Sequence, residues 1–321
     1  RGALAAVPLT MDLERVEILK GPQGILFGKN TIGGAINITT ARPSFDFEGM
    51  VDALYSDDHG EQQYNVVLNG GITDRIAGRL AVRYDAMDGW WDNELLNTEG
   101  PDRDNWYGRG TLLFEATDNL EIIAKYEYGD FQTDGQPLVI TQSDQPQNFL
   151  GDDVIPIVDD EDKAAFDLDD SADVRTDVAA LTLNWDIEFA TLTSISAYSH
   201  YELETVTNSD FAATPGLHRT KDEDFDQWSQ ELRLVSPGGE TIDWIVGAYY
   251  EHSELEVNRV NTEADFALSG PLAVQPLVLS TENPVPTEFD QDNDTFAAFA
   301  QLTYSLTDRV RVTGGLRYND E

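Results

Sequence analysis

The sequence contains no cysteine among its 321 residues. This absence excludes a disulfide framework, a metal site built on thiolates, and a cysteine nucleophile. It does not assign the protein to a cellular compartment.

Positive charge is scarce as well. Twenty Lys and Arg residues stand against 60 Asp and Glu residues, which gives a formal net charge of −40. Nucleic-acid binding depends on clustered cations that neutralise phosphates, so this composition excludes DNA and RNA as partners. The excess of carboxylates is far larger than solubility alone requires.

Long apolar runs are also missing. The sequence has no stretch of about 18 consecutive apolar residues, so no transmembrane helix is predicted. The first residues, RGALAAVPLTMD, are not expected to form a signal peptide, because their apolar stretch is short and ends at Pro8. Membrane-spanning β-strands give a much weaker signal per segment, and this scan does not exclude them.

Residues 20–34, KGPQGILFGKNTIGG, are rich in glycine and superficially similar to a phosphate-binding loop. A P-loop requires Gly, four residues, and then Gly-Lys followed by Ser or Thr. Here Gln23 occupies the place of the first glycine, and Asn30 occupies the place of the hydroxyl residue. Nucleotide binding is therefore not expected, and Lys29 receives no catalytic role.

Alternation of apolar and polar residues dominates the chain from about residue 46 onward. Leu120, Ile122 and Tyr126, for example, alternate with Glu121 and Lys125. A period of two with one apolar and one polar face is typical of β-strands. About eleven strands are predicted in this way, at residues 46–56, 61–71, 75–87, 105–116, 120–131, 174–185, 189–206, 226–236, 241–256, 293–305 and 309–319.

Short and long connections alternate between these strands. Loops longer than about 15 residues are uncommon in compact soluble domains. Their placement on every second connection predicts an all-β, antiparallel, up-and-down transmembrane β-barrel with short turns at one end and long loops at the other. The short turns carry Asp, Asn or Gly and are expected at 71–75, 116–119, 185–188, 236–240 and 306–309, and the long loops near 87–105, 132–173, 207–225 and 257–292.

In such a barrel the apolar face contacts lipid and the polar face lines an aqueous lumen. Aromatic residues toward the strand ends, such as Tyr84, Tyr126 and Trp244, are expected at the lipid interface. The alternative is a soluble, acidic β-sandwich with a binding or adhesion function, in which the charges form a solvated face. The residues expected to face the lumen are Arg79, Arg83, Glu121, Lys125, Arg311 and Arg317.

Residues 12–43, DLERVEILKGPQGILFGKNTIGGAINITTARP, resemble the C-terminal end of the plug domain of TonB-dependent outer-membrane receptors. QELRLVSP (230–237) and FAAFAQLTYSLTDRVRVTGGLRYN (296–319) resemble barrel segments of that family. The resemblance implies that residues 1–45 are the C-terminal part of a plug and residues 46–321 are the N-terminal half of the barrel. About eleven of about twenty-two barrel strands would then lie in this chain, without the signal peptide and the TonB box.

The plug motif explains the glycines. Gly21 and Pro22 are expected to form a turn, Gly24 and Gly28 to let the backbone bend, and Gly33-Gly34 to bring the second strand close to a neighbour. The motif positions are Glu14, Arg15, Glu17, Gly21, Pro22, Gly24, Gly28, Asn30, Gly33 and Gly34.

The resemblance further implies TonB-dependent uptake of a scarce nutrient across the outer membrane of a Gram-negative cell. The implied ligand is a ferric siderophore, with cobalamin, haem or a carbohydrate as alternatives. TonB, acting with ExbB and ExbD, would bind an N-terminal segment missing from this chain. The receptor is expected to contact outer-membrane lipid, to be a monomer and to carry no cofactor.

Two sets of residues are candidates for the site. By the resemblance, Glu14, Arg15 and Glu17 of the plug pair with lumen residues such as Arg79, Arg83 or Glu121, with plain surface exposure as the alternative. Trp90 and Trp91 fall in a long loop and are candidates for ligand contact, because Trp is a common anchor in binding surfaces. The alternative for both tryptophans is the aromatic belt.

No enzyme activity is predicted. The histidines at 59, 200, 218 and 252 form no HxxxH or HExxH arrangement, and the sequence has no GxSxG nucleophile motif. The acidic stretches at 152–173 and 222–226 lack the pattern of a Ca²⁺ loop. Hydration of surface loops is their expected role, with loose Ca²⁺ or Mg²⁺ binding as the alternative. No catalytic residue and no metal site are therefore assigned.

Overall fold

The computed structural model describes residues 11–28, 31–135, 163–209, 218–262, 284–307 and 309–321. The predicted motif residue Asn30 and the first half of the acidic stretch at 152–173 lie outside these ranges. Among the described residues, no helix is long and apolar enough to cross a membrane.

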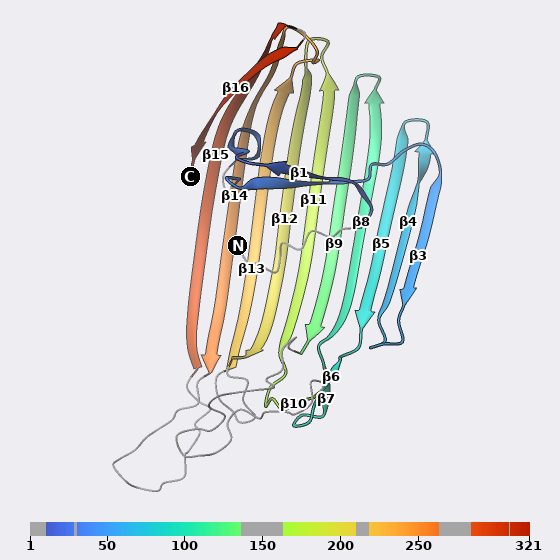
Figure 1. Cartoon of the computed structure of the whole chain (residues 1–321), viewed down its shortest axis with the longest axis vertical. Helices are drawn as coiled ribbons and strands as arrows, with labels where there is room; N and C mark the ends of the chain where they lie inside the picture. Colours follow the sequence, from blue (N-terminus) through green and yellow to red (C-terminus); the bar gives the residue numbers. More distant parts are fainter. Residues whose placement is uncertain (1–10, 29–30, 136–162, 210–217, 263–283, 308) are drawn as a thin grey trace, which may run out of the picture.

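One antiparallel sheet of eleven strands forms most of the molecule (Figure 1). Its strands follow one another in sequence order, so the sheet is an up-and-down meander, as predicted. A β-sandwich would divide these strands between two packed sheets, so the arrangement of all eleven in one sheet rules out that alternative. The strands are β3 (Glu48–Tyr55), β4 (Gln62–Thr73), β5 (Ile76–Met87), β8 (Asp102–Thr117), β9 (Leu120–Asp134), β11 (Ser171–Asp186), β12 (Thr191–Asn208), β13 (His218–Val235), β14 (Ile242–Thr262), β15 (Pro284–Thr307) and β16 (Val310–Asp320).

Each of the eleven predicted strands has a counterpart in this sheet, and three of them extend much farther at one end than predicted. Strand β13 begins at His218 rather than at 226, β14 runs to Thr262 rather than 256, and β15 begins at Pro284 rather than 293. In these extensions both faces are largely polar, which hides the alternation in the sequence. The register between β13 and β14 nevertheless continues without a break to the pair His218–Thr262.

A hairpin lies across one face of the sheet (Figure 1). Strands β1 (Leu13–Lys20) and β2 (Gly34–Thr40) pair antiparallel, and the short helix α1 (Gly24–Phe27) lies between them. We call residues 11–47 the N-terminal segment, and the face of the sheet that it contacts the inner face.

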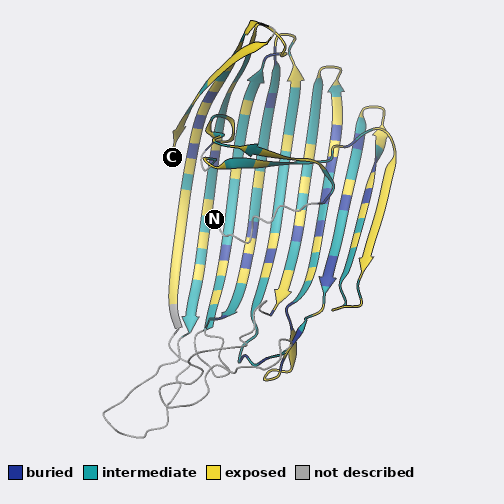
Figure 2. Cartoon of the chain, in the orientation of Figure 1, coloured by how far each residue is buried: buried dark blue, intermediate teal, exposed yellow. Residues whose placement is uncertain are grey.

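Burial alternates along the strands, as a two-residue period requires (Figure 2). Inner-face residues such as Val67 and Ala81 are 3% and 1% exposed, whereas Leu80 and Leu302 on the outer face are each 49% exposed. Large apolar side chains thus cover a face that no other part of the described chain packs against. Such a face is expected when lipid is the neighbour.

Tyrosines mark the edge of this apolar band that lies nearest the long connections. On four successive hairpins, an outer-face tyrosine donates a hydrogen bond to an aspartate on the next strand, two positions nearer the long connection. The pairs are Tyr84–Asp104 (2.9 Å), Tyr126–Asp177, Tyr198–Asp226 and Tyr250–Asp294 (2.7 Å). Each hydroxyl therefore has a partner at the height where the apolar face ends.

Beyond the tyrosines the outer face becomes acidic. Three successive outer-face rows of cross-strand partners run from β11 to β15. All of their positions are carboxylates except Arg175, His200 and Asn258. Carboxylates directly opposite one another repel. Water and counter-ions must therefore cover this part of the strands, which we call the acidic outer face; its carboxylates are Asp173, Asp177, Glu202, Glu204, Asp222, Asp224, Asp226, Glu254, Glu256, Glu288, Asp290 and Asp292.

A separate, three-stranded sheet lies among the long connections. It consists of β6 (Trp91–Asn93), β7 (Thr98–Gly100) and β10 (Lys163–Ala164). Trp91, Ala164 and Phe166 form a small core beneath it. Parts of two connections predicted as irregular loops thus carry structure of their own.

Candidate functional site

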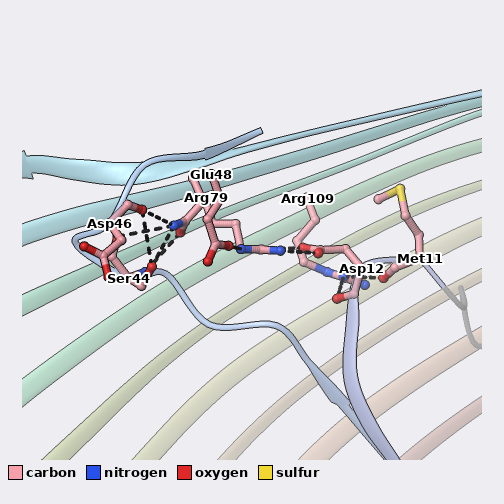
Figure 3. Close-up of polar contacts among 8 residues, drawn as sticks. Met11, Asp12, Ser44, Asp46, Glu48, Arg79 and Arg109 are labelled. Carbon is pink, nitrogen blue, oxygen red and sulfur yellow. Dashed lines mark hydrogen bonds and ion pairs between the residues drawn. The ribbon is translucent and has the colours of Figure 1, made fainter. Parts of the chain in front are cut away.

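The contact between the N-terminal segment and the sheet is centred on Asp12. Both carboxylate oxygens of Asp12 accept hydrogen bonds from the guanidinium of Arg79 on β5, at 2.6 and 2.8 Å (Figure 3). The two side chains are only 6% and 14% exposed. Asp12 has φ +52°, a left-handed conformation that Asp tolerates better than most residues. A bidentate, buried pair of this kind is among the stronger polar contacts available to a protein.

Arg109 on β8 makes a second contact with the same segment. Its guanidinium donates to the backbone oxygen of Met11 at 2.9 Å, to Glu127 at 2.6 Å and to the Tyr107 hydroxyl at 2.8 Å. The arginine is 4% exposed, so Glu127 compensates its charge in a nearly dry position. Asp12 and Met11 together are thus held by cations from two neighbouring strands (Figure 3).

Further contacts hold the rest of the segment along the sheet. Arg42 forms an ion pair with Glu121 of β9 at 2.6 Å, and Arg317 of β16 donates to the backbone oxygen of Ile25 at 3.4 Å. Near the entry into β3, the Asn69 side chain donates to Ser44 Oγ at 2.8 Å. The segment is therefore held at both ends of the hairpin by groups of the sheet.

The structure gives the predicted ion-pair residues different partners. Arg15 contacts Glu14 at 2.6 Å and Glu17 at 3.4 Å, on its own strand, and not Arg79, Arg83 or Glu121. Arg15 lies on the part of the hairpin where its neighbours on β1 are the nearest carboxylates. Asp12 lies at the start of the hairpin, where the chain contacts the large sheet. Two of the predicted residues of the large sheet, which forms the barrel wall, do contact the N-terminal segment: Arg79 pairs with Asp12, and Glu121 pairs with Arg42. The third, Arg83, contacts Asp85 and Gln63 within the sheet.

Three of the five motif glycines occupy demanding backbone positions, whereas Gly24 and Gly33 have neither a positive φ nor a close neighbour. Gly21 and Gly28 have φ of +81° and +77°, which L side chains rarely adopt. At Gly34 a Cβ would lie 2.4 Å from the backbone oxygen of Leu19 on the neighbouring strand. The close approach predicted for Gly33-Gly34 thus falls at Gly34, since a Cβ at Gly33 would meet open space. Pro22 follows the turn at Gly21, and Gly24 begins α1.

A cavity of about 500 Å³ opens between β2 and the inner face. Ile38 and Thr40 line it from the hairpin, and the sheet contributes side chains from β8, β9, β11 and β12. Its sheet residues extend from Arg109 toward the long connections, so the cavity lies on that side of the N-terminal segment. An apolar cavity with a few convergent polar groups is the usual form of a small-molecule site.

Inner-face aromatic residues give this region its apolar character, and sequence reasoning missed them. Tyr107 and Phe131 line the cavity, and Tyr201 stacks on Phe225 with ring centroids 5.1 Å apart. The Tyr201 hydroxyl donates to Glu223. The signal was available, because these aromatics occupy the inward parity of their strands, where polar residues are otherwise expected in an aqueous lumen.

The tryptophans predicted to contact ligand differ from expectation. Trp91 is 2% exposed and packs edge-on against Phe166 at 5.8 Å between ring centroids, with Trp90 against the same core. Trp91 is therefore a core residue of the small sheet rather than an exposed anchor or a member of the aromatic belt. The sequence placed it in an irregular loop because β6 is only three residues long.

The structure also brings together three groups that spacing did not connect. His200 and Glu202 of β12 and Asp224 of β13 point from the acidic outer face, with ligand atoms within 4.8 Å of one another. The set spans two strands, so no HxxxH-type pattern could reveal it. By strand alternation, these three side chains point away from the face on which the Tyr201 side chain lines the cavity.

These observations define a class of protein: a membrane β-barrel wall with a lipid-facing apolar band, a charged inner face and a folded segment held across its lumen. The chain belongs to the TonB-dependent receptor family. Residues 126–321 match the family described as TonB dependent receptor-like, beta-barrel. Members of this family lie in the outer membrane of Gram-negative bacteria, which places this chain there.

Characterised relatives support this assignment. The chain is 26% identical to the ferric aerobactin receptor of Klebsiella pneumoniae and 25% identical to the pesticin receptor of Yersinia pestis. The alignments cover 96% and 97% of this chain but 42% of each relative. The chain thus spans about two fifths of the length of the relatives that it matches.

Solved structures show the same fold. The ferric yersiniabactin uptake receptor FyuA from Yersinia pestis superposes with a TM-score of 0.76 at 21% identity, covering 96% of this chain and 44% of that structure. The ferripyoverdine receptor of the outer membrane of Pseudomonas aeruginosa superposes with a TM-score of 0.74 at 15% identity, covering 97% and 42%. The similarity includes the N-terminal segment, because nearly the whole chain is covered.

Proposed function

We propose that this chain is part of a receptor for TonB-dependent active uptake, and that its ligand is a ferric siderophore. The observation that carries the proposal is the N-terminal segment, held across the inner face by Asp12–Arg79, Arg109 and Arg42–Glu121. A ligand in the adjacent cavity would meet this segment before it could pass along the wall.

In this proposal residues 1–45 are the C-terminal part of a plug, and residues 46–321 are the N-terminal half of a barrel of about twenty-two strands. TonB, energised through ExbB and ExbD, would act on a segment preceding residue 1. The receptor would work as a monomer, and no catalytic step is assigned to it.

The contacts suit a plug that must both seal and move. Most of the ion pairs around the segment are partly exposed, and such pairs contribute about 0–1 kcal/mol each. The buried pair Asp12–Arg79 is the exception, because separating it leaves a charge uncompensated at a cost of about 3–5 kcal/mol. Displacement of the segment therefore requires work at one defined point, which an energised partner can supply.

The names of relatives support iron as the cargo. One matching relative is named for ferric aerobactin, and two similar structures are named for ferric yersiniabactin and ferripyoverdine. Cobalamin, haem and carbohydrate remain alternatives for a receptor of the same type.

Uptake of radioactive iron tests the proposal. Cells that express the receptor in its full natural length should accumulate iron from a culture-derived siderophore extract. Accumulation should stop when TonB is deleted, and expression should rise under iron starvation. Equal accumulation with and without the receptor would refute the role in iron uptake, and correct insertion is checked independently by heat-modifiable migration of the outer-membrane fraction.

A further inference from the structure

The cations of the large sheet are sorted by face. Register and alternation place nearly all Lys and Arg residues of the described sheet strands on the inner face, and Arg175 alone on the outer face. A chain with a net charge of −40 thus concentrates its positive charge along the lumen. The inner-face cations are Arg79, Arg83, Arg103, Arg109, Lys125, Arg219, Lys221, Arg233, Arg259, Arg311 and Arg317.

Several of these cations form ion pairs with neighbouring carboxylates. Arg79 pairs with Asp12, Arg109 pairs with Glu127, and Arg103 contacts Asp85 at 3.2 Å. Each pair is built into the wall or into the contact with the N-terminal segment. They therefore offer little free positive charge to a ligand.

A group of three cations near the long connections is different. Arg219 and Lys221 lie on β13, and Arg259 on β14 is the direct cross-strand partner of Lys221. Lys221 contacts Glu223, but Arg219 donates to the neutral Asn261 at 2.9 Å. Within the described strands, neither Arg219 nor Arg259 forms an ion pair with a carboxylate.

Arg259 carries a second, independent signal. Its Nε is buried and has no hydrogen-bond partner among the described residues. A buried guanidinium donor without an acceptor is costly, and like charges directly opposite each other repel. An anionic group placed between Arg259 and Lys221 would remove both penalties.

On the same inner face, aromatic side chains lie between these three cations and the cavity. From Phe225, the inner-face residues of β13 are Glu223, Lys221 and Arg219, at intervals of about 6.6 Å along the strand. Phe225 stacks on Tyr201, which lines the cavity. The arrangement presents an apolar platform followed by a patch of positive charge.

We propose that Arg219, Lys221 and Arg259 form an anion-binding site that receives a carboxylate group of the imported ligand, so that the ligand is a carboxylate-bearing, anionic iron chelate. The inference rests on the proposed uptake function and names the substrate class for it. An anionic ligand is the opposite of what the net charge of −40 alone suggests, since an acidic surface disfavours anionic ligands at long range. The local field of Arg219 and Arg259, which no carboxylate of the described strands neutralises, overrides that effect once the ligand has entered, and Lys221 adds a donor that it shares with Glu223.

Citrate without iron is the probe for this site. The receptor in its full natural length, purified in detergent, is titrated with citrate in a calorimeter at low ionic strength, with sodium chloride of matched ionic strength as the reference. Saturable binding is expected. Loss of one charge-assisted contact should weaken it about tenfold in Arg259→Gln and in Arg219→Gln.

Arg175→Gln is the matched control, because it removes a cation from the outer face of the same sheet. Its citrate affinity should equal that of the unmodified receptor. Absence of saturable binding, or equal affinities in Arg259→Gln and the unmodified receptor, would overturn the site. If Arg259→Gln fails to fold, as judged by heat-modifiable migration, Lys221→Gln decides in its place.

The two proposals fail separately. Citrate binding that Arg259→Gln weakens, in a receptor that transports no iron, would keep the anion site and remove the iron cargo. Receptor-dependent iron uptake without citrate binding would keep the uptake function and remove the anion site.

Discussion

Asp12 and Arg79, 67 positions apart in the sequence, form a two-point ion pair that is nearly closed to solvent. It joins the root of the N-terminal hairpin to strand β5. Since the pair is both buried and bidentate, it dominates the polar contacts between the segment and the wall.

Asp12→Asn should therefore increase the passage of small solutes through the receptor. The substitution leaves the Arg79 charge buried without its counter-charge, which weakens the seal by about 3–5 kcal/mol. Conductance of single receptors in a planar lipid bilayer measures the effect. Arg83→Gln is the control, because Arg83 also lines the inner face but pairs within the wall. Equal conductance in the two variants would contradict the prediction.

Arg109→Gln should lower the stability of the folded receptor by about 3 kcal/mol, since it removes the shorter of the two ion pairs of Glu127, leaving Lys125 at 3.2 Å, and releases Met11 and Tyr107. The midpoint of heat-modifiable migration reports the change. Arg175→Gln is the matched control, because Arg175 is 57% exposed and its carboxylate partners lie 4.0 Å away. Exposed pairs at that distance contribute close to nothing. A control that is as destabilised as Arg109→Gln would argue against a special role for this arginine.

Trp91→Ala should unfold the three-stranded sheet locally. Removing a buried tryptophan costs about 3–5 kcal/mol, more than so small a core can lose. Hydrogen exchange should show lost protection in residues 91–100. Leu96→Ala, at a site 40% exposed, should leave protection unchanged. Preserved protection combined with weaker ligand binding would instead restore the earlier interpretation of Trp91 as a ligand contact.

Glu17 gives a pH-dependent prediction. The Asn37 amide donates to its carboxylate at 2.8 Å, and this hydrogen bond, with Arg15 beside it, holds the pKa of Glu17 below its ordinary value. A lowered folded-state pKa means that this contact stabilises the hairpin above the unfolded-state pKa and is lost as the pH falls through the folded-state pKa. Asn37→Ala should therefore raise the pKa of Glu17, as measured by carbon NMR of labelled carboxylates. Asn65→Ala, which removes an amide from Asp52, should leave Glu17 unchanged.

The strands could be predicted from the sequence because each carries its own evidence. The alternation around Leu120 and Glu121 and the tight turns at Asp118 and Gly238 are local features, and the eleven strands follow from them. The extension of β13 to His218 could not be predicted, since a polar strand beyond the lipid has no apolar face to reveal it.

The partners within the site depend on the register of distant strands. The sequence motif singled out Arg15, but Asp12 reaches the wall, because only the root of the hairpin approaches β5. Arg79 and Glu121 were identified through their inward parity, while the identity of their partners required the fold. Trp91 was misplaced for the same reason, as its neighbours Ala164 and Phe166 come from another connection.

The row of tyrosine–aspartate pairs, with the acidic outer face beyond it, also has a mechanical consequence. The apolar side chains between this row and the short turns can lie in hydrocarbon, but the dense carboxylates between the row and the long connections cannot. The wall therefore has a fixed depth in the bilayer and resists being dragged toward the cell interior. A pull on the N-terminal segment from that side would act against an anchored frame, so the work would go into separating Asp12 from Arg79 rather than into sinking the whole molecule.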